Sequence, residues 1–189
     1  MSLLIQYTIL YASVLILVAL GGCFSEHSGV INLGLEGIMV MGALGGALTM
    51  KYLIGYPPVV IVILTILAAA VTGLVFSALL AVACINFKAD QTIVGTALNM
   101  LGLAAATVIV KAINIAENPD NVSSTVQYIA QKKAFLVNIG GFDFNWMMLV
   151  ALVILIVAYI VLYKTKFGLR LMACGEHPQA ADSVGINGY

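Results

Sequence analysis

The stretch SGVINLGLEGIMVMGALGGALTM (residues 28–50) is long enough to cross a bilayer and contains one charged residue, Glu36. Asn32 lies one helical turn before it, and Gly34 and Gly37 flank it. A carboxylate at membrane depth is costly unless it faces protein, a partner or water. Glycines let the backbone bend or approach another helix closely. The stretch therefore indicates a transport pathway or a packed polar junction more than a simple anchor.

The composition of the whole chain is that of a membrane protein. Hydrophobic residues make up 62% and charged residues 8% of the 189 residues, where a soluble domain has about one-quarter charged. Crossing a hydrocarbon core takes about 20 helical residues. Stretches near residues 3–24, 28–50, 57–86, 91–111 and 144–163 meet or approach that length. We predict an all-α, polytopic helical membrane protein with about five spans.

Several classes of function have no support in the sequence. The net charge is zero, so the chain has no basic footprint for nucleic acid. It contains neither a GxxxxGK[ST] loop for ATP phosphates nor an HExxH zinc motif. Its three cysteines share no close spacing and predict neither a disulfide framework nor a metal site. We expect no enzyme activity, no cofactor and no metal.

The loops predict part of the topology. Lys164, Lys166 and Arg170 follow the last predicted span, which by the positive-inside rule places this end in the cytoplasm. One crossing separates that end from the long connection at residues 111–143, so we expect the connection outside. Within it, residues 126–137 could form an interfacial amphipathic helix. The side of the N-terminus stays open, because a re-entrant second span would move it inside.

The C-terminal segment, residues 175–185, has the signals of a short helix. Pro178 suits a first helical position, and Gly185 can end the helix. Ala180, Ala181 and Val184 then share one small apolar face. A docking element for another protein and a helix lying on the membrane surface fit this pattern about equally.

The fourth predicted span carries a stripe of polar and small residues at steps of three or four. Its members are Gln91, Gly95, Asn99, Gly102 and Ala106, with Thr92 and Thr96 beside them. Such a stripe faces protein or a water-filled cavity. Close helix packing and a place on a solute path remain equal interpretations.

Two segments together resemble a known family. FSEHSGVINLGLEGIM (residues 24–39) is similar to the signature of bacterial ABC-importer permeases for nucleosides and simple sugars. FGLR (167–170), ACGEHPQAA (173–181) and VGIN (184–187) resemble that family's cytoplasmic loop, and GTALN (95–99) resembles a segment between them. Branched-chain amino-acid permeases share a more distant form of the pattern.

The resemblance implies a transport subunit with partners in a bacterial inner membrane. These are an ATPase that binds the ATP, a second permease subunit or copy, and an extracellular substrate-binding lipoprotein. The tail helix would couple to the ATPase through Gly175, Glu176, His177, Pro178, Ala180, Ala181, Val184 and Gly185. The candidates for the translocation path or for bracing it are Asn32, Glu36, Gln91, Thr96 and Asn99.

The resemblance also sets the expected domain organisation. Residues 1–163 would form the membrane region and residues 164–189 a cytoplasmic loop with its coupling helix. Family members continue with further spans, so we expect this chain to be the N-terminal portion of the domain. The favoured substrate is a nucleoside, and sugars, other small polar solutes and branched-chain amino acids are the alternatives. The alternative functions are a secondary transporter or channel, in which Glu36 carries a proton or lines a pore, and a structural membrane scaffold.

Overall fold

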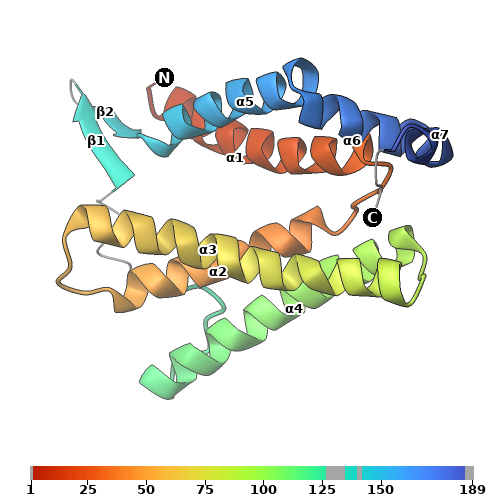
Figure 1. The fold of residues 1–189 in the computed structure, drawn as a ribbon. Coiled ribbons are helices and arrows are strands. Elements are labelled where there is room, and N and C mark those ends of the chain that lie inside the picture. The colour runs from red at the N-terminus through yellow and green to blue at the C-terminus, as the bar shows by residue number, and fades with distance from the viewer. Residues whose placement is uncertain (1, 127–134, 140–141, 186–189) are drawn as a thin grey trace. The chain divides into compact units, whose positions relative to one another are not determined.

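The computed structural model describes residues 2–126, 135–139 and 142–185. Within these ranges the chain forms seven α-helices, one π-helical turn and two short strands. It divides into two compact units (Figure 1). The first unit comprises Met1–Asn32 and Val137–Tyr189, and the second comprises Leu33–Leu136. The predicted all-α class is confirmed, because the described chain is mainly helical.

Four helices build the first unit: α1 (Ser2–His27), α5 (Met147–Lys164), α6 (Lys166–Glu176) and α7 (Pro178–Ser183). Helices α1 and α5 lie side by side, and α6 also contacts α1 (Figure 1). Both long helices are apolar on every side, which is the composition of a helix surrounded by lipid or other apolar helices.

Local sequence explains where these helices begin and end. The side-chain oxygen of Asn145 accepts the Met147 N–H at 3.0 Å just before α5. Thr165 separates α5 from α6, and its hydroxyl oxygen accepts the Gly168 N–H at 3.4 Å as an N-cap. Helix α7 begins at Pro178, the position that the sequence predicts.

Two short strands, β1 (Leu136–Ile139) and β2 (Phe142–Asn145), pair with each other before α5. They overlap the end of the interfacial helix predicted at residues 126–137, so residues 136 and 137 are strand instead. Most of that predicted helix, residues 127–134, lies outside the described residues.

The second unit holds α2 (Leu35–Tyr52), α3 (Pro58–Ala81) and α4 (Gln91–Glu117). A π-helical turn, η1 (Val82–Asn86), extends α3. Helix α2 packs against both α3 and α4 (Figure 1). The ends of α3 and α4 are set locally, since α3 has proline at its first position and Asp90 caps α4.

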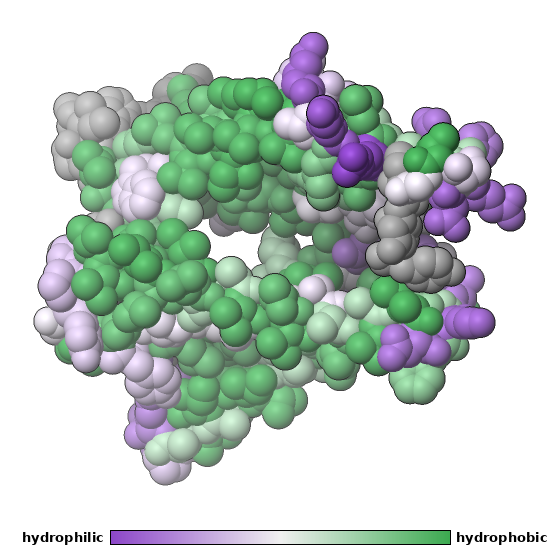
Figure 2. Space-filling model, viewed as in Figure 1, coloured by the Kyte–Doolittle hydropathy of each residue, from purple (hydrophilic) through white to green (hydrophobic). Residues whose placement is uncertain are grey.

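Few side chains are buried, and large apolar ones cover much of the surface. The buried cluster of the second unit consists of Phe76, Leu80 and Leu98. In contrast, Leu74 is 68% exposed and Met100 75% exposed. Figure 2 shows this as broad hydrophobic surface along the helices. A surface of this kind favours lipid and apolar partners over water.

Four described helical segments are long and apolar enough to cross a membrane: Leu4–His27, Pro58–Asn86, Gln91–Glu117 and Met147–Lys164. The second predicted span, residues 28–50, differs from the prediction. Its helix, α2, begins only at Leu35 and carries a charge near each end. The seven residues before it are not helical, and each of the two turns in that segment ends at a glycine, Gly29 or Gly34. Glycine is unfavourable inside a helix and suits such turns.

Candidate functional site

The candidate site is the junction between the start of α2 and the middle of α4. Asn99 of α4 bridges two backbone groups there: its Oδ1 accepts the Gly37 N–H at 2.8 Å, and its Nδ2 donates to the Leu33 carbonyl oxygen at 2.7 Å. The residue at the α2 N-cap, Gly34, supplies no side-chain cap. Asn99 of α4 therefore takes the place of a capping residue of α2, because it accepts the Gly37 N–H in the first turn of that helix.

Small residues bring the two helices into backbone contact at this junction. A Cβ added to Gly102 would lie 2.7 Å from the Gly37 Cα, and one added to Gly95 would lie 2.9 Å from the Leu33 Cβ. Side chains at these positions would push the helices apart. Gly95, Asn99 and Gly102 of the predicted stripe therefore face α2, which is the helix-packing interpretation of the stripe.

Three other predicted members of the site lie on α4 or in the segment before α2. Thr96 is exposed, and its hydroxyl donates to the Thr92 and Ile93 carbonyl oxygens of its own helix at 3.0 and 2.9 Å. Gln91 is half-buried at the first residue of α4. Asn32 is half-buried in the non-helical segment before α2.

Glu36 lies in the first turn of α2 with its side chain exposed. Among the described residues we find no hydrogen bond or ion pair of its carboxylate. Within the part of the chain that the structure describes, it is therefore not held in a polar junction, which was one of the two interpretations of the sequence. The amino-terminal turn is favourable for a negative charge, because the helix dipole is positive there.

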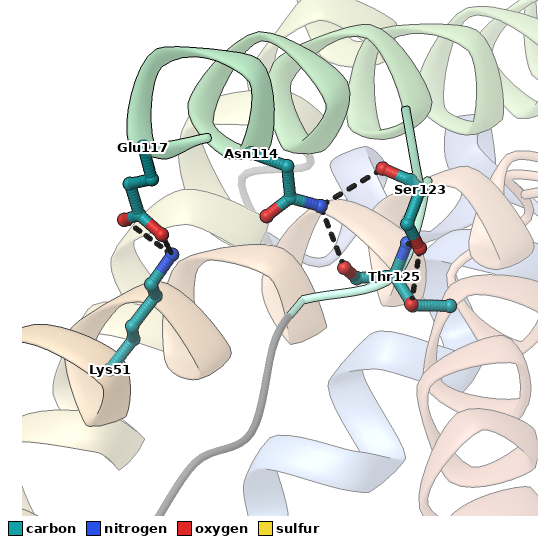
Figure 3. A network of polar contacts seen from close by, with 5 residues as sticks. All are labelled: Lys51, Asn114, Glu117, Ser123 and Thr125. Carbon is teal, nitrogen blue, oxygen red and sulfur yellow. Dashed lines mark hydrogen bonds and ion pairs between the residues drawn. The ribbon is translucent and has the colours of Figure 1, made fainter. Parts of the chain in front are cut away.

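A polar network at the other end of α2 and α4 was not predicted from the sequence (Figure 3). Lys51 Nζ forms an ion pair with Glu117, at 2.6 Å to Oε1 and 2.7 Å to Oε2. Asn114 is only 1% exposed, and its Nδ2 donates to the carbonyl oxygens of Ser123 and Thr125 at 2.9 Å. The sequence offers a signal for the pair, since both charges stand near the ends of apolar spans.

The C-terminal helix α7 presents a different face from the predicted one. Ala181 is 4% exposed and packs inward, whereas Val184 is 74% exposed and Ala180 is exposed. The predicted small apolar face is thus divided between the interior and the surface. Beside it lies a surface depression of about 280 Å³, lined by Ala173, Glu176, His177, Ala180, Ala181 and Val184. Pro178 and Gly185 are exposed at the two ends of α7.

Gly175, predicted as a coupling residue, packs inside the first unit. A Cβ there would collide with the His27 carbonyl oxygen and lie 2.8 Å from the Gly29 nitrogen. Gly29 has φ +80°, a conformation that favours glycine. His27 itself is tied to its surroundings, with Nδ1 2.8 Å from the Cys23 carbonyl oxygen and Nε2 3.4 Å from the Tyr163 hydroxyl.

These features define a polytopic helical membrane protein in which polar groups join helices and an exposed short helix follows the last span. Within the described residues, no group of three or more His, Cys, Asp or Glu side chains is placed to hold a metal ion. Residues 4–189 match the family described as the branched-chain amino acid transport system / permease component, and the chain belongs to this family.

Two relatives are similar along the whole chain. It is 38% identical over 198 residues to the guanosine ABC transporter permease protein NupQ of Bacillus subtilis. It is 36% identical over 199 residues to the nucleoside ABC transporter permease protein NupC of Lactococcus lactis. The alignments cover 100% of this chain and 60% and 61% of those relatives. No solved structure matches the chain.

Proposed function

We propose that the chain is part of the permease subunit of an ATP-driven importer for nucleosides. The observation that carries this is the similarity to NupQ and NupC across the full chain. Family membership and the exposed apolar helices support a role within a membrane. The proposed substrate class follows the two relatives whose names specify guanosine and nucleosides.

The proposed assembly has three partners in a bacterial inner membrane. They are an ATPase that binds ATP, a second permease subunit or copy, and an extracellular substrate-binding lipoprotein. The end of the chain that holds Lys164 and α7 would face the cytoplasm and the ATPase. The exposed surface of α7, centred on Ala180 and Val184, is the proposed contact with that ATPase.

For the path itself, we propose that Glu36 faces the solute and that Asn99 braces the helix that carries Glu36. Exposed carboxylates are strongly disfavoured in lipid, so the exposed Glu36 side chain is better placed toward a water-filled path or a partner subunit. Asn32, Gln91 and Thr96 would lie near the path. Their polar side chains on otherwise apolar segments support this placement.

Glu36→Ala in the complete subunit should lower nucleoside uptake by tenfold or more, because the polar group facing the path is removed. Uptake of labelled guanosine by cells, normalised to the amount of subunit in the membrane, measures this effect. Glu26→Ala is the matched control, since Glu26 is also an exposed glutamate but lies in the last turn of α1. Equal uptake by the Glu36 variant and the wild type would remove Glu36 from the path.

Ala180→Arg should weaken capture of the ATPase by several tens-fold, because a charge buried without a partner at an interface costs about 2–5 kcal/mol. Co-purification of the ATPase with the complete subunit measures the loss. Ser124→Arg is the control at an exposed residue of the connection between α4 and β1. Full ATPase recovery with Ala180→Arg would show that α7 is only a surface helix. Ala181 is unsuitable for this test, because its buried side chain supports the tail itself.

The proposed function as a whole is tested by deleting the gene for the complete subunit and measuring uptake. We expect uptake of labelled nucleosides to fall and to return with the gene. If uptake of branched-chain amino acids or glucose falls instead, the proposed substrate class is wrong. If nucleoside uptake survives depletion of ATP and follows the proton gradient, the protein is a secondary transporter.

A further inference from the structure

Helix α6 has one face turned toward its own chain. Gly168 packs against the carbonyl of Leu162, and Gly175 packs against that of His27. These glycines are seven residues apart, about two helical turns, so they mark the same inward side. The opposite side of α6 is therefore its outward side.

The outward side is basic. Lys166 and Arg170 are four residues apart and share this side, and Lys164 stands in the last turn of α5 just before it. All three side chains are exposed. Within the described residues none of them takes part in an ion pair, because Lys51–Glu117 is the pair found there. Figure 2 shows hydrophilic surface gathered where α5 passes into α6 and α7.

Large apolar side chains flank the three cations. Phe167 is 59% exposed and Leu169 is 62% exposed. Both sit in the first turn of α6, one residue from Lys166 or Arg170. Helices that lie in the membrane interface combine such apolar groups, inserted at the acyl boundary, with basic groups at headgroup level.

We propose that this outward face, formed by Lys164, Lys166, Phe167, Leu169 and Arg170, binds anionic phospholipid. Only Thr165 separates α6 from α5, an apolar helix long enough to cross a membrane, so the face follows directly on a segment suited to lipid. The positive charge complements a negative headgroup, and juxtamembrane basic clusters are attracted to anionic lipid. Bound lipid would hold α6 in the interface and so fix the position of α7. The proposal does not depend on which solute is transported.

The test titrates the purified complete subunit in detergent with phosphatidylglycerol or phosphatidylcholine and measures the lipid-bound fraction by native mass spectrometry. Wild-type protein should bind phosphatidylglycerol more tightly than phosphatidylcholine. Lys166→Gln/Arg170→Gln should lose about 30-fold in affinity for phosphatidylglycerol, given the contribution of each basic residue near an anionic surface. Lys88→Gln/Lys111→Gln removes the same charge at exposed positions outside this face and should bind as the wild type does.

A second variant serves as a control for misfolding. Lys166→Arg/Arg170→Lys keeps the charge and should retain the preference for phosphatidylglycerol, with an unchanged melting temperature in lipid-free detergent. Equal affinity of the wild type for both lipids would overturn the proposal, and so would equal losses in the two glutamine variants. If the Lys166/Arg170 glutamine variant keeps its lipid preference but no longer captures the ATPase, the face binds protein, and the proposal is wrong.

Discussion

Gly102→Leu should lower the free energy of unfolding by about 3 kcal/mol, since overpacking a close contact costs about this much. A Cβ added at Gly102 would lie 2.7 Å from the Gly37 Cα and 2.9 Å from the Gly37 carbonyl oxygen. These are backbone atoms of another helix and cannot rotate away, so α2 and α4 must separate. Denaturation of the purified complete subunit in detergent, followed by circular dichroism, measures the loss.

Ala104→Leu is the matched control for this prediction. Ala104 lies two residues further along α4 and is exposed, so the same kind of enlargement meets no neighbouring helix. We expect its unfolding free energy to stay within about 0.5 kcal/mol of the wild type. If both leucine variants are equally stable, the close contact between α2 and α4 does not exist in the protein.

Asn99→Leu should lower the free energy of unfolding by about 2–6 kcal/mol, because it leaves two backbone groups without a partner, at about 1–3 kcal/mol each. The Gly37 N–H loses its acceptor and the Leu33 carbonyl oxygen loses its donor. Asn99→Asp should be intermediate, since it keeps an acceptor for Gly37 and loses the donor. The same denaturation measurement ranks the three proteins.

Thr96→Val is the control for Asn99→Leu, because it also removes a polar side chain from α4 but breaks no bond to α2. The Thr96 hydroxyl bonds only to carbonyl oxygens of its own helix, which are already used by the helix backbone. Its replacement should change stability by no more than about 0.5 kcal/mol. A Thr96 effect as large as that of Asn99→Leu would mean that the bridge to α2 is not what stabilises the junction.

The long helices could be predicted from the sequence because their signals are local. Uninterrupted apolar runs set their length, and Pro58, Asp90 and Lys164 mark where they begin or end. The start of α2 could not be predicted in this way. The segment before it includes Gly29 with φ +80°, and that conformation is fixed by packing against Gly175, 146 positions along the chain.

From the sequence, the residues of the candidate site could be predicted, but not the groups that they contact. The spacing of Gly95, Asn99 and Gly102 shows that one side of α4 is special, but it does not say which helix meets that side. The partner groups of Asn99 are backbone atoms at Leu33 and Gly37. Because nearly every residue has the same backbone groups, residue types cannot show which of them Asn99 bonds. The carboxylate of Glu36 was prominent in the sequence, yet whether it is satisfied inside the chain needed the three-dimensional structure.

In the C-terminal tail, the sequence likewise did not predict which side of α7 is buried. Ala180 and Ala181 are adjacent, and a six-residue helix gives too few turns to define a buried side by periodicity. Which alanine is buried depends on how α6 places α7, and this placement rests on Gly168 and Gly175. The helix itself was predictable from Pro178, whereas its outward face was not.

Uptake of labelled guanosine into proteoliposomes is the most direct test of ATP-driven nucleoside import by this protein. They would contain the complete permease, its ATPase and its binding protein, with ATP on the side of α7. We expect uptake that requires hydrolysable ATP and is competed by other nucleosides. Uptake that needs no ATP but follows a proton gradient would contradict this expectation, as would uptake competed by branched-chain amino acids and not by nucleosides.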